Sequence, residues 1–405
     1  MRPGVTVLAT DSRKEIELCT LHVRSVGHGA CIAMDAPCVG SNVHIDCGSM
    51  ESAPWAAEEY LRLGRTVRHA DAFILSHFHY DHYNGLVWLA GQDGRGPRVF
   101  VEAAYYPRIP DVVRRPELRP ALLRCMVAFA CYAAARPSRL LLGDKRRLVQ
   151  RHFAEVVRQV SVCPRGCLGV ADGDVISGTR GGYSIVWPPR QVWSNDPYGR
   201  AMQDGVQAFR AAAEADRELR EAYEMTADAE LAAQYLPSVE HAGRPLNDDY
   251  TRARDDECDD DQDDVELPPE DDGERPADIE VYGTYEEELS PPVRRANQAL
   301  RNVADLFSLA FHCNPHLLFL GDLKSREIHR VVTALCSGRG PVRYNVLVSA
   351  HHGTRWNRSL RNIFVRQAVV SSVGGRLRDL VCPEYDNFGV PHYLTCRDGH
   401  LALYL

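Results

Sequence analysis

The first ninety residues alternate short apolar runs with turn residues, a pattern that predicts a β-rich opening. Three such runs lie between residues 18 and 46, and a helical pattern follows at Trp55–Leu63. The next apolar run, DAFILSHFH, leads into a stretch rich in histidine. We therefore expect several strands and one crossover helix before residue 90.

Residues from about 110 to 160 carry apolar side chains at spacings of three and four, which predicts helices. Pro120 and Pro137 interrupt the pattern, so we expect two or three helices there. Strand-like patterns return near residues 167–189.

The chain between about residues 195 and 295 differs from both flanks. Gln207–Leu236, rich in Ala and Glu, predicts helix, whereas Asn247–Pro292 is acidic and poor in aromatic residues, which predicts disorder. Residues 255–274, the acidic tract, contain 13 Asp or Glu and no Lys or Arg. Three roles are open for this tract: a solvated linker, a mimic of nucleic acid that covers a basic face, or part of a protein-binding segment at 247–292.

The last hundred residues return to a mixed pattern of strands and helices. DLFSLAFHC, a short turn and LLFLGDL predict a β-hairpin, Ser325–Leu335 predicts a helix, and YNVLVSA, AVVSSVGG and HLALYL predict strands. We expect the following division: residues 1–190 with a helical insertion at about 108–160, an inserted segment at 191–295, and residues 296–405.

Composition restricts the class of protein. Hydrophobic residues make up 45% and charged residues 25% of the 405 positions, which is typical of a globular protein. No apolar stretch approaches the roughly 18 residues of a membrane span, and the first residues lack the apolar run of a signal peptide. We therefore expect a soluble cytoplasmic protein with no membrane partner, and 13 scattered cysteines that are mostly reduced and buried.

The acidic tract dominates the net charge of −8. Its 13 acidic residues exceed that value, so the rest of the chain is net positive. A positive body is compatible with DNA or RNA as a substrate.

The segment Ile74–Leu86, ILSHFHYDHYNGL, concentrates residues that bind metals. An apolar strand leads into four such residues, and alternate positions can direct their side chains to one side. Imidazoles together with a carboxylate suit zinc, iron or manganese, whereas magnesium and calcium sites are almost entirely oxygen. The sequence therefore predicts a transition-metal site at His77, His79, Asp81 and His82.

These residues resemble a motif of the metallo-β-lactamase superfamily of hydrolases, and the resemblance continues in order along the chain. Further similar segments are Val26–Cys31, His44–Gly48, Phe319–Asp322 and Val348–Gly353. In the family these supply the opening strands, the strand that ends in a metal-bridging aspartate, and the last histidine motif. Val370–Gly374 and Phe388–His392 are similar to the closing strand and loop of one branch, the domains related to the DNA-uptake competence protein.

The resemblance implies an α/β fold, a four-layer αββα sandwich interrupted by a helical insertion and a disordered acidic insertion. It also implies two divalent metals, zinc or manganese, at one edge of the sheets, with a metal-bound hydroxide as the nucleophile. Asp81 is expected to be essential for catalysis as well as for binding. The implied ligands are His77 and His79 for the first metal, Asp322 as the bridge, and Asp81, His82 and either His352 or, less favoured, His351 for the second.

One departure concerns the third protein ligand of the first metal. Most family members supply a histidine from the middle of the chain, where related domains often have Leu-His-Pro-Pro and this chain has Val186-Trp187-Pro188-Pro189. His152 lies in a helical pattern and His241 in the polar insertion, so we favour neither. The third ligand stays open.

Four further residues are candidates for substrate chemistry. His28 and His392 lie in loops that the resemblance places near the metals, where each could donate a proton to the leaving group or hold an oxyanion. Each could equally be a hydrogen-bonded loop histidine. Arg355 and Arg358 follow the histidine motif and could bind a phosphate, although exposed surface arginines are more common.

Three functions remain open. The favoured hypothesis is a metal-dependent phosphodiesterase or nuclease. A second is a hydrolase of a small molecule such as a cyclic nucleotide, lactone or β-lactam. A third, from another class, is a weakly catalytic effector or scaffold subunit of a bacterial multi-protein stress or defence system, which rests on analogy with the branch.

Overall fold

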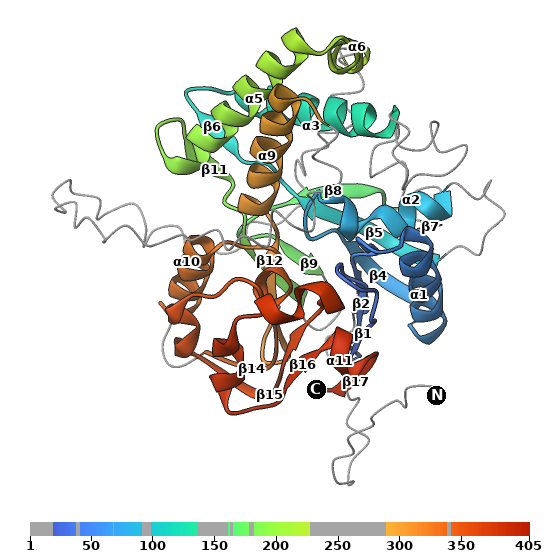
Figure 1. Ribbon diagram of the computed structural model, residues 1–405. Coiled ribbons are helices and arrows are strands. Elements are labelled where there is room, and N and C mark those ends of the chain that lie inside the picture. Colours follow the sequence, from blue (N-terminus) through green and yellow to red (C-terminus); the bar gives the residue numbers. More distant parts are fainter. Residues whose placement is uncertain are drawn as a thin grey trace, which may run out of the picture.

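Two β-sheets with helices outside them form the described part of the chain in the computed structural model (Figure 1). The described residues are 19–37, 41–67, 69–90, 99–135, 161–162, 165–177, 182–226, 289–337 and 342–405. The acidic tract, His152 and His241 lie outside them.

The first sheet is built mainly from the N-terminal half of the chain. Its strands run in the order β17-β1-β2-β3-β4-β5-β7, and β8 also pairs with β5. The C-terminal strand β17 pairs antiparallel with β1, whereas β3, β4 and β5 are parallel. The strand bounds are β1 Thr20–Val23, β2 Ile32–Asp35, β3 Val43–Ile45, β4 His69–Ile74, β5 Val99–Pro107, β7 Ser161–Val162, β8 Cys167–Val170 and β17 Leu401–Tyr404.

The second sheet is built mainly from the C-terminal third. Its order is β16-β15-β14-β13-β12-β10-β9, with β12 and β13 antiparallel and β13, β14, β15 and β16 parallel. Because parallel strands end at the same edge of a sheet, the segments that follow β13 and β14 lie close together. The bounds are β9 Val175–Ser177, β10 Gly182–Trp187, β12 Ala310–Cys313, β13 Leu317–Phe319, β14 Val342–Val348, β15 Ile363–Ser371 and β16 His392–Leu394.

The two sheets pack face to face. Alternate side chains of each strand point to the shared interface, where they form one buried apolar cluster. Within it the rings of Phe311 and Phe319 stack, with their centroids 4.8 Å apart. Members from the first sheet include Leu21, Ile32, Ile45 and Ile74, and members from the second include Ile185, Phe311, Val346 and Val370.

Helices cover the outer faces of both sheets. On the first, α1 (Ala53–Thr66) and α2 (Asn84–Ala90) bury apolar side chains against the strands. The helix α1 begins at Ala53 because the Ser52 side chain accepts a hydrogen bond from the Trp55 backbone N–H, a typical N-cap. On the second sheet, α10 (Ser325–Cys336) packs through Ile328, Val331 and Val332.

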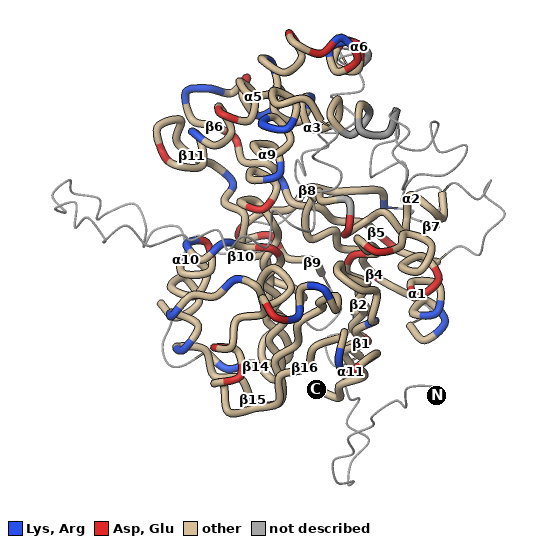
Figure 2. Tube along the Cα trace, in the orientation of Figure 1, with Lys and Arg blue, Asp and Glu red and all other residues tan. Residues whose placement is uncertain are grey.

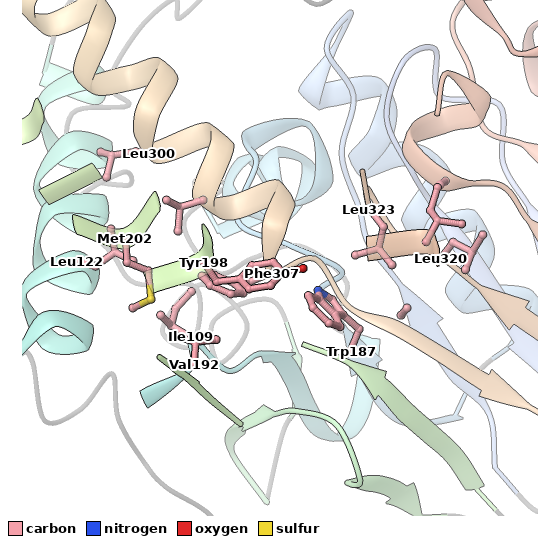
Figure 3. Close-up of a cluster of buried hydrophobic side chains, with 14 of the residues drawn as sticks. Ile109, Leu122, Trp187, Val192, Tyr198, Met202, Leu300, Phe307, Leu320 and Leu323 are labelled. Atoms are coloured by element: carbon pink, nitrogen blue, oxygen red, sulfur yellow. The ribbon is translucent and has the colours of Figure 1, made fainter. Parts of the chain in front are cut away.

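Four more helices form a helical layer at one end of the second sheet (Figure 1). They are α3 Leu118–Ala135, α5 Pro197–Ala215, α6 Arg217–Met225 and α9 Pro291–Leu306, beside the short parallel pair β6 Asp111–Val113 and β11 Gln191–Trp193. Figure 3 shows Tyr198 of α5, Phe307 at the end of α9 and Trp187 at the end of β10 in one buried cluster. The layer therefore joins the second sheet through a continuous apolar core.

Short helical turns complete the described chain. Two of them, η1 and η3, carry predicted ligands and are described with the site. The bounds are η1 Tyr80–His82, η3 Ala350–Gly353, η4 Arg358–Asn362, η5 Gly375–Leu380, η6 Pro383–Phe388 and α11 Thr395–Asp398.

The predicted α/β class and αββα layering are confirmed by this arrangement. The helices expected at Trp55–Leu63 and Ser325–Leu335 are present, as is the β12–β13 hairpin. The expected break at Pro120 is wrong: α3 begins at Leu118, so Pro120 stands in its first turn, where its missing N–H costs no intrahelical hydrogen bond. The sequence pattern also does not predict α9, which spans the expected boundary at residue 295.

The structure bears on two expectations from composition, those on membrane spans and on cysteines. No described helix has the length and apolarity to cross a bilayer. Among the described cysteines, Cys19 is disulfide-bonded, and the free ones are Cys31, Cys47, Cys125, Cys167, Cys313, Cys336, Cys382 and Cys396.

Candidate metal centre

The loop after β4 gathers the four locally predicted ligands. The strand ends at Ile74, and η1 turns the chain back at Tyr80–His82. His77, His79, Asp81 and His82 are all buried, with side chains directed into a common region. Short spacing along one loop is sufficient to bring them together.

The parallel strands of the second sheet bring the distant ligands to this loop. Asp322 follows β13, and His351 and His352 form η3 directly after β14, the parallel neighbour of β13. One carboxylate oxygen, Oδ2 of Asp322, faces the Nε2 atoms of four buried histidines. The distances are 3.5 Å to His77, 3.6 Å to His352 and 3.7 Å to both His82 and His351. The structure thus brings Asp322 together with the histidines of two separate loops.

Three sets of side chains have ligand atoms within 4.8 Å of one another. We call them the first, second and third ligand groups. The first ligand group is His77, His79, Asp305 and Asp322; the second is His82, Asp322 and His352; the third is His28, Asp81 and His352. His352 therefore belongs to two groups, whereas His351 belongs to none of the three, although its Nε2 lies 3.7 Å from Asp322.

Several atoms of these groups fit a metal. The Nε2 atoms of His77, His82 and His352 and the Oδ1 atom of Asp305 are buried and accept or donate no hydrogen bond among the described residues. Buried polar atoms are nearly always partnered, so such orphans in one place need a ligand. Imidazole nitrogens and carboxylate oxygens are the donors that zinc, manganese and iron accept.

Residues outside the three groups orient the ligands. Asp46 Oδ2 lies 2.8 Å from His82 Nδ1 and 2.7 Å from the Ser76 hydroxyl, and His352 Nδ1 lies 2.8 Å from the Ser372 carbonyl oxygen. In both histidines Nδ1 is thereby committed, so Nε2 is the nitrogen that faces Asp322 and that would bind a cation. Partners of this kind set the tautomer and ring orientation of metal-binding histidines.

Backbone geometry at the site is unusual at three ordered residues. Asp46, His351 and His352 have φ values of 55°, 47° and 57°, in the left-handed region that non-glycine residues rarely adopt. Beside Asp46, a Cβ on Gly48 would lie 2.1 Å from the Asp81 backbone oxygen, so only glycine lets the two loops approach. The chain holds these turns in place although local sterics oppose them.

Burial and the neighbouring ionisable groups shift the pKa values within the site. Burial lowers the pKa of His77 well below its usual range, and the neighbouring His82 adds to the effect. Burial would also lower the pKa of His82, but the carboxylates of Asp46, Asp322 and Asp81 outweigh it and raise the pKa to about 10. Burial raises the pKa of Asp322 well above its usual range. A bound cation would favour anionic carboxylates and neutral imidazoles, the forms that bind metals.

The four candidates for substrate chemistry are distributed differently. His28 lies inside the centre, with its ring centroid 4.2 Å from that of His352. His392 belongs to none of the three groups: its Nε2 lies 2.8 Å from the Ser371 hydroxyl and its Nδ1 2.8 Å from Asp386. Arg355 contacts the edge of the site, with Nε 3.3 Å from His351 Nδ1, whereas Arg358 is exposed at the start of η4.

Sequence reasoning missed Asp305 and the role of Asp46. Asp46 carried a signal, because it stands in the segment His44–Gly48 that matched the family's opening turn. Asp305 carried none beyond being an acidic residue before an apolar run. Its position depends on α9, which the sequence pattern does not predict.

Comparisons with known proteins add little to this geometry. No protein-family model matches the chain, and no curated protein matches it. A solved structure, the subclass B3 metallo-β-lactamase MEM-A1 isolated from a soil metagenome library, aligns at 20% identity and a TM-score of 0.22. The alignment covers 42% of this chain and spans only half of that chain.

Proposed function

We propose that this chain is a metal-dependent hydrolase that cleaves phosphodiester bonds. One observation carries the proposal: a single oxygen of Asp322 faces the Nε2 atoms of four buried histidines at 3.5 to 3.7 Å. Such convergence from separate loops is costly without a cation, because buried polar groups lacking partners destabilise a fold.

The three ligand groups would hold the metals, with Asp322 shared between the first and second groups. Metal ions in such a site lower the pKa of a bound water and stabilise charge on the attacked group. The chain's own residues prepare this chemistry. Asp46 and the Ser372 carbonyl keep His82 and His352 in the tautomer that presents Nε2, and burial of the ligands excludes bulk water.

Cationic side chains beside the ligands support an anionic substrate. Lys324 follows Asp322 by two residues and contacts the Asn302 amide oxygen of α9. Arg355 contacts His351, and the charge of Arg301 acts on His79. Two arginines, Arg326 and Arg330, follow on α10, which begins at Ser325, three residues after Asp322 (Figure 2). Such cationic groups stabilise a bound phosphate through charge-assisted hydrogen bonds, whereas an uncharged lactone has no anionic group for them to pair with.

An activity screen tests the proposal. Purified protein would be loaded with Mn²⁺ or Zn²⁺ and assayed on single-stranded DNA, duplex DNA, RNA, cyclic nucleotides and nitrocefin. We expect hydrolysis of a phosphodiester, and a loss on the order of 100-fold or more in Asp81→Ala and Asp322→Ala. Asp174→Asn is the carboxylate control, because Asp174 belongs to none of the ligand groups and accepts a hydrogen bond from the Ala171 backbone N–H.

The same screen separates the alternatives. Hydrolysis of nitrocefin alone would overturn the phosphodiesterase proposal in favour of a small-molecule hydrolase. Protein that retains less than about half an equivalent of transition metal after reloading, and hydrolyses nothing, would favour a scaffold or effector role. Lys324→Met and Arg355→Met should raise KM for a phosphodiester more than they lower kcat, because both side chains would act in binding.

A further inference from the structure

The C-terminal end of α9 contributes a carboxylate, Asp305, to the candidate metal centre. Asp305 is 8% exposed, and its Oδ1 lies 3.4 Å from His79 Nδ1. That Oδ1 is buried and makes no hydrogen bond among the described residues. With His77, His79 and Asp322 it forms the four-membered first ligand group, all of whose donor atoms lie within 4.8 Å.

The same helix also orients the histidine that faces Asp305. His79 Nε2 lies 3.3 Å from the Arg301 backbone oxygen, one turn before Asp305. A carbonyl oxygen only accepts, so Nε2 carries the proton and the lone pair of Nδ1 is directed at the ligand group. The end of α9 thus supplies both a donor atom and the partner that sets a neighbouring donor.

Trp187 holds this end of α9 at the site. Its indole Nε1 donates a 2.7 Å hydrogen bond to the Leu306 backbone oxygen, directly after Asp305. Figure 3 shows the indole beside Phe307 and Leu323, in the apolar core between the helical layer and the second sheet. Trp187 occupies the sequence position at which the resembled domains often have a histidine. Here that position anchors the helix that brings Asp305.

We propose that Asp305 is the third ligand that belongs to the first metal alone, beside His77 and His79, so that with the shared Asp322 this metal is bound by two imidazoles and two carboxylates. The inference rests on the metal centre of the proposed function, not on its substrate. Two carboxylates this close repel each other unless a cation lies between them. The carbonyl groups at a helix C-terminus also favour a cation there.

The donor set has a consequence for metal choice. Carboxylates suit manganese better than zinc, whereas imidazoles suit zinc. Because Asp305 stands in for the imidazole that the resemblance implies, the first site should prefer Mn²⁺ more strongly than a site with three imidazoles would. Restoring an imidazole with Asp305→His should move it back toward Zn²⁺.

Metal binding by the full-length protein tests the assignment without any substrate. The metal-free protein would be titrated with Mn²⁺ and Zn²⁺ against a chromophoric chelator, and metal content would be measured by mass spectrometry. We expect two equivalents for the wild type, and for Asp305→Asn either one equivalent or an affinity at the first site lower by on the order of 100-fold. For Asp305→His we expect two equivalents and a zinc-over-manganese preference increased by at least about tenfold.

A spectrum and a control make the test specific. Co²⁺-loaded protein reports ligand exchange through its visible absorption bands, which should differ between wild type and Asp305→Asn. Glu327→Gln is the matched control, because Glu327 is a buried carboxylate that accepts a hydrogen bond from Tyr198 outside the ligand groups. Its metal content and spectrum should equal those of the wild type.

The outcomes separate this inference from the proposed function. Unchanged stoichiometry, affinity and cobalt spectrum in Asp305→Asn would overturn the assignment of Asp305 alone. Absence of metal binding in the wild type would overturn both. Asp305-dependent metal binding with no phosphodiester hydrolysis would support Asp305 as a ligand and contradict the proposed substrate.

Discussion

Asp46 Oδ2 lies 2.8 Å from His82 Nδ1, and the pair is shielded from solvent. The same carboxylate accepts hydrogen bonds from the backbone and side chain of Ser76, so it joins the end of β4 to the ligand loop. Asp46 therefore determines which nitrogen of His82 faces Asp322, and it belongs to none of the three ligand groups itself.

We predict that Asp46→Asn lowers metal affinity by about 10- to 100-fold, the usual effect of removing a carboxylate that orients a metal-binding histidine. Asparagine tolerates the positive φ of this position, so the backbone turn is retained. Chelator competition measures the effect, with Asp174→Asn as the control. Wild-type affinity in Asp46→Asn would exclude the orienting role.

The hydrogen bond by which Trp187 holds the end of α9 can be tested separately. Trp187→Phe keeps an aromatic ring in the core but removes the hydrogen bond to the Leu306 carbonyl. We expect a loss of about 1 to 3 kcal/mol in the free energy of unfolding, measured by urea denaturation. Metal affinity at the first site should fall as well, because Asp305 is then held less firmly.

The exposed Trp193 provides the comparison for that experiment. It is 54% exposed on β11, so Trp193→Phe should change neither stability nor metal affinity appreciably. Equal effects of the two substitutions would exclude the Trp187 hydrogen bond as the cause.

The lowered pKa of the buried His44 should make the free energy of unfolding depend on pH. Burial lowers the pKa of His44 to about 4, while its Nε2 lies 3.1 Å from the Val67 carbonyl oxygen. A histidine whose pKa is lower in the folded state stabilises the fold fully above about pH 6.5, and this contribution is lost as pH falls toward 4. By pH 5 the loss should be about 2 kcal/mol.

Urea denaturation of wild type and His44→Gln at pH 8 and pH 5 measures this contribution. Other histidines titrate in both proteins, so the informative quantity is the difference between them. His44→Gln should lose less stability between the two pH values than the wild type. The same loss in both proteins would remove His44 as the source.

Variants of His392 and Ser371 distinguish a proton-donating role of His392 from a positioning role. A chain of hydrogen bonds runs from Asp386 through His392 and the Ser371 hydroxyl to the Ser349 hydroxyl, at the start of the turn that carries His351 and His352. We predict that His392→Ala and Ser371→Ala both lower metal affinity, by about tenfold, along with kcat. A proton donor would instead lose kcat at unchanged metal affinity, and Ser371→Ala would then leave kcat intact.

The sequence by itself determined which candidate ligands lie close together along the chain and which follow neighbouring strands. His77, His79, Asp81 and His82 need only one loop, and Asp322 and His352 need only the parallel pairing of β13 and β14. Alternating apolar patterns determine such strands because each strand must bury one or both faces.

Tertiary structure alone decided the positions of Asp305, Trp187 and His392. Asp305 reaches the first ligand group because α9 packs against α5 and the Trp187 indole holds its last turn. His392 bonds to Ser371 and Asp386, since the register of β15 and β16 sets its ring there. These positions depend on contacts between elements far apart in the chain, and neither hydrophobic periodicity nor motif spacing encodes such contacts.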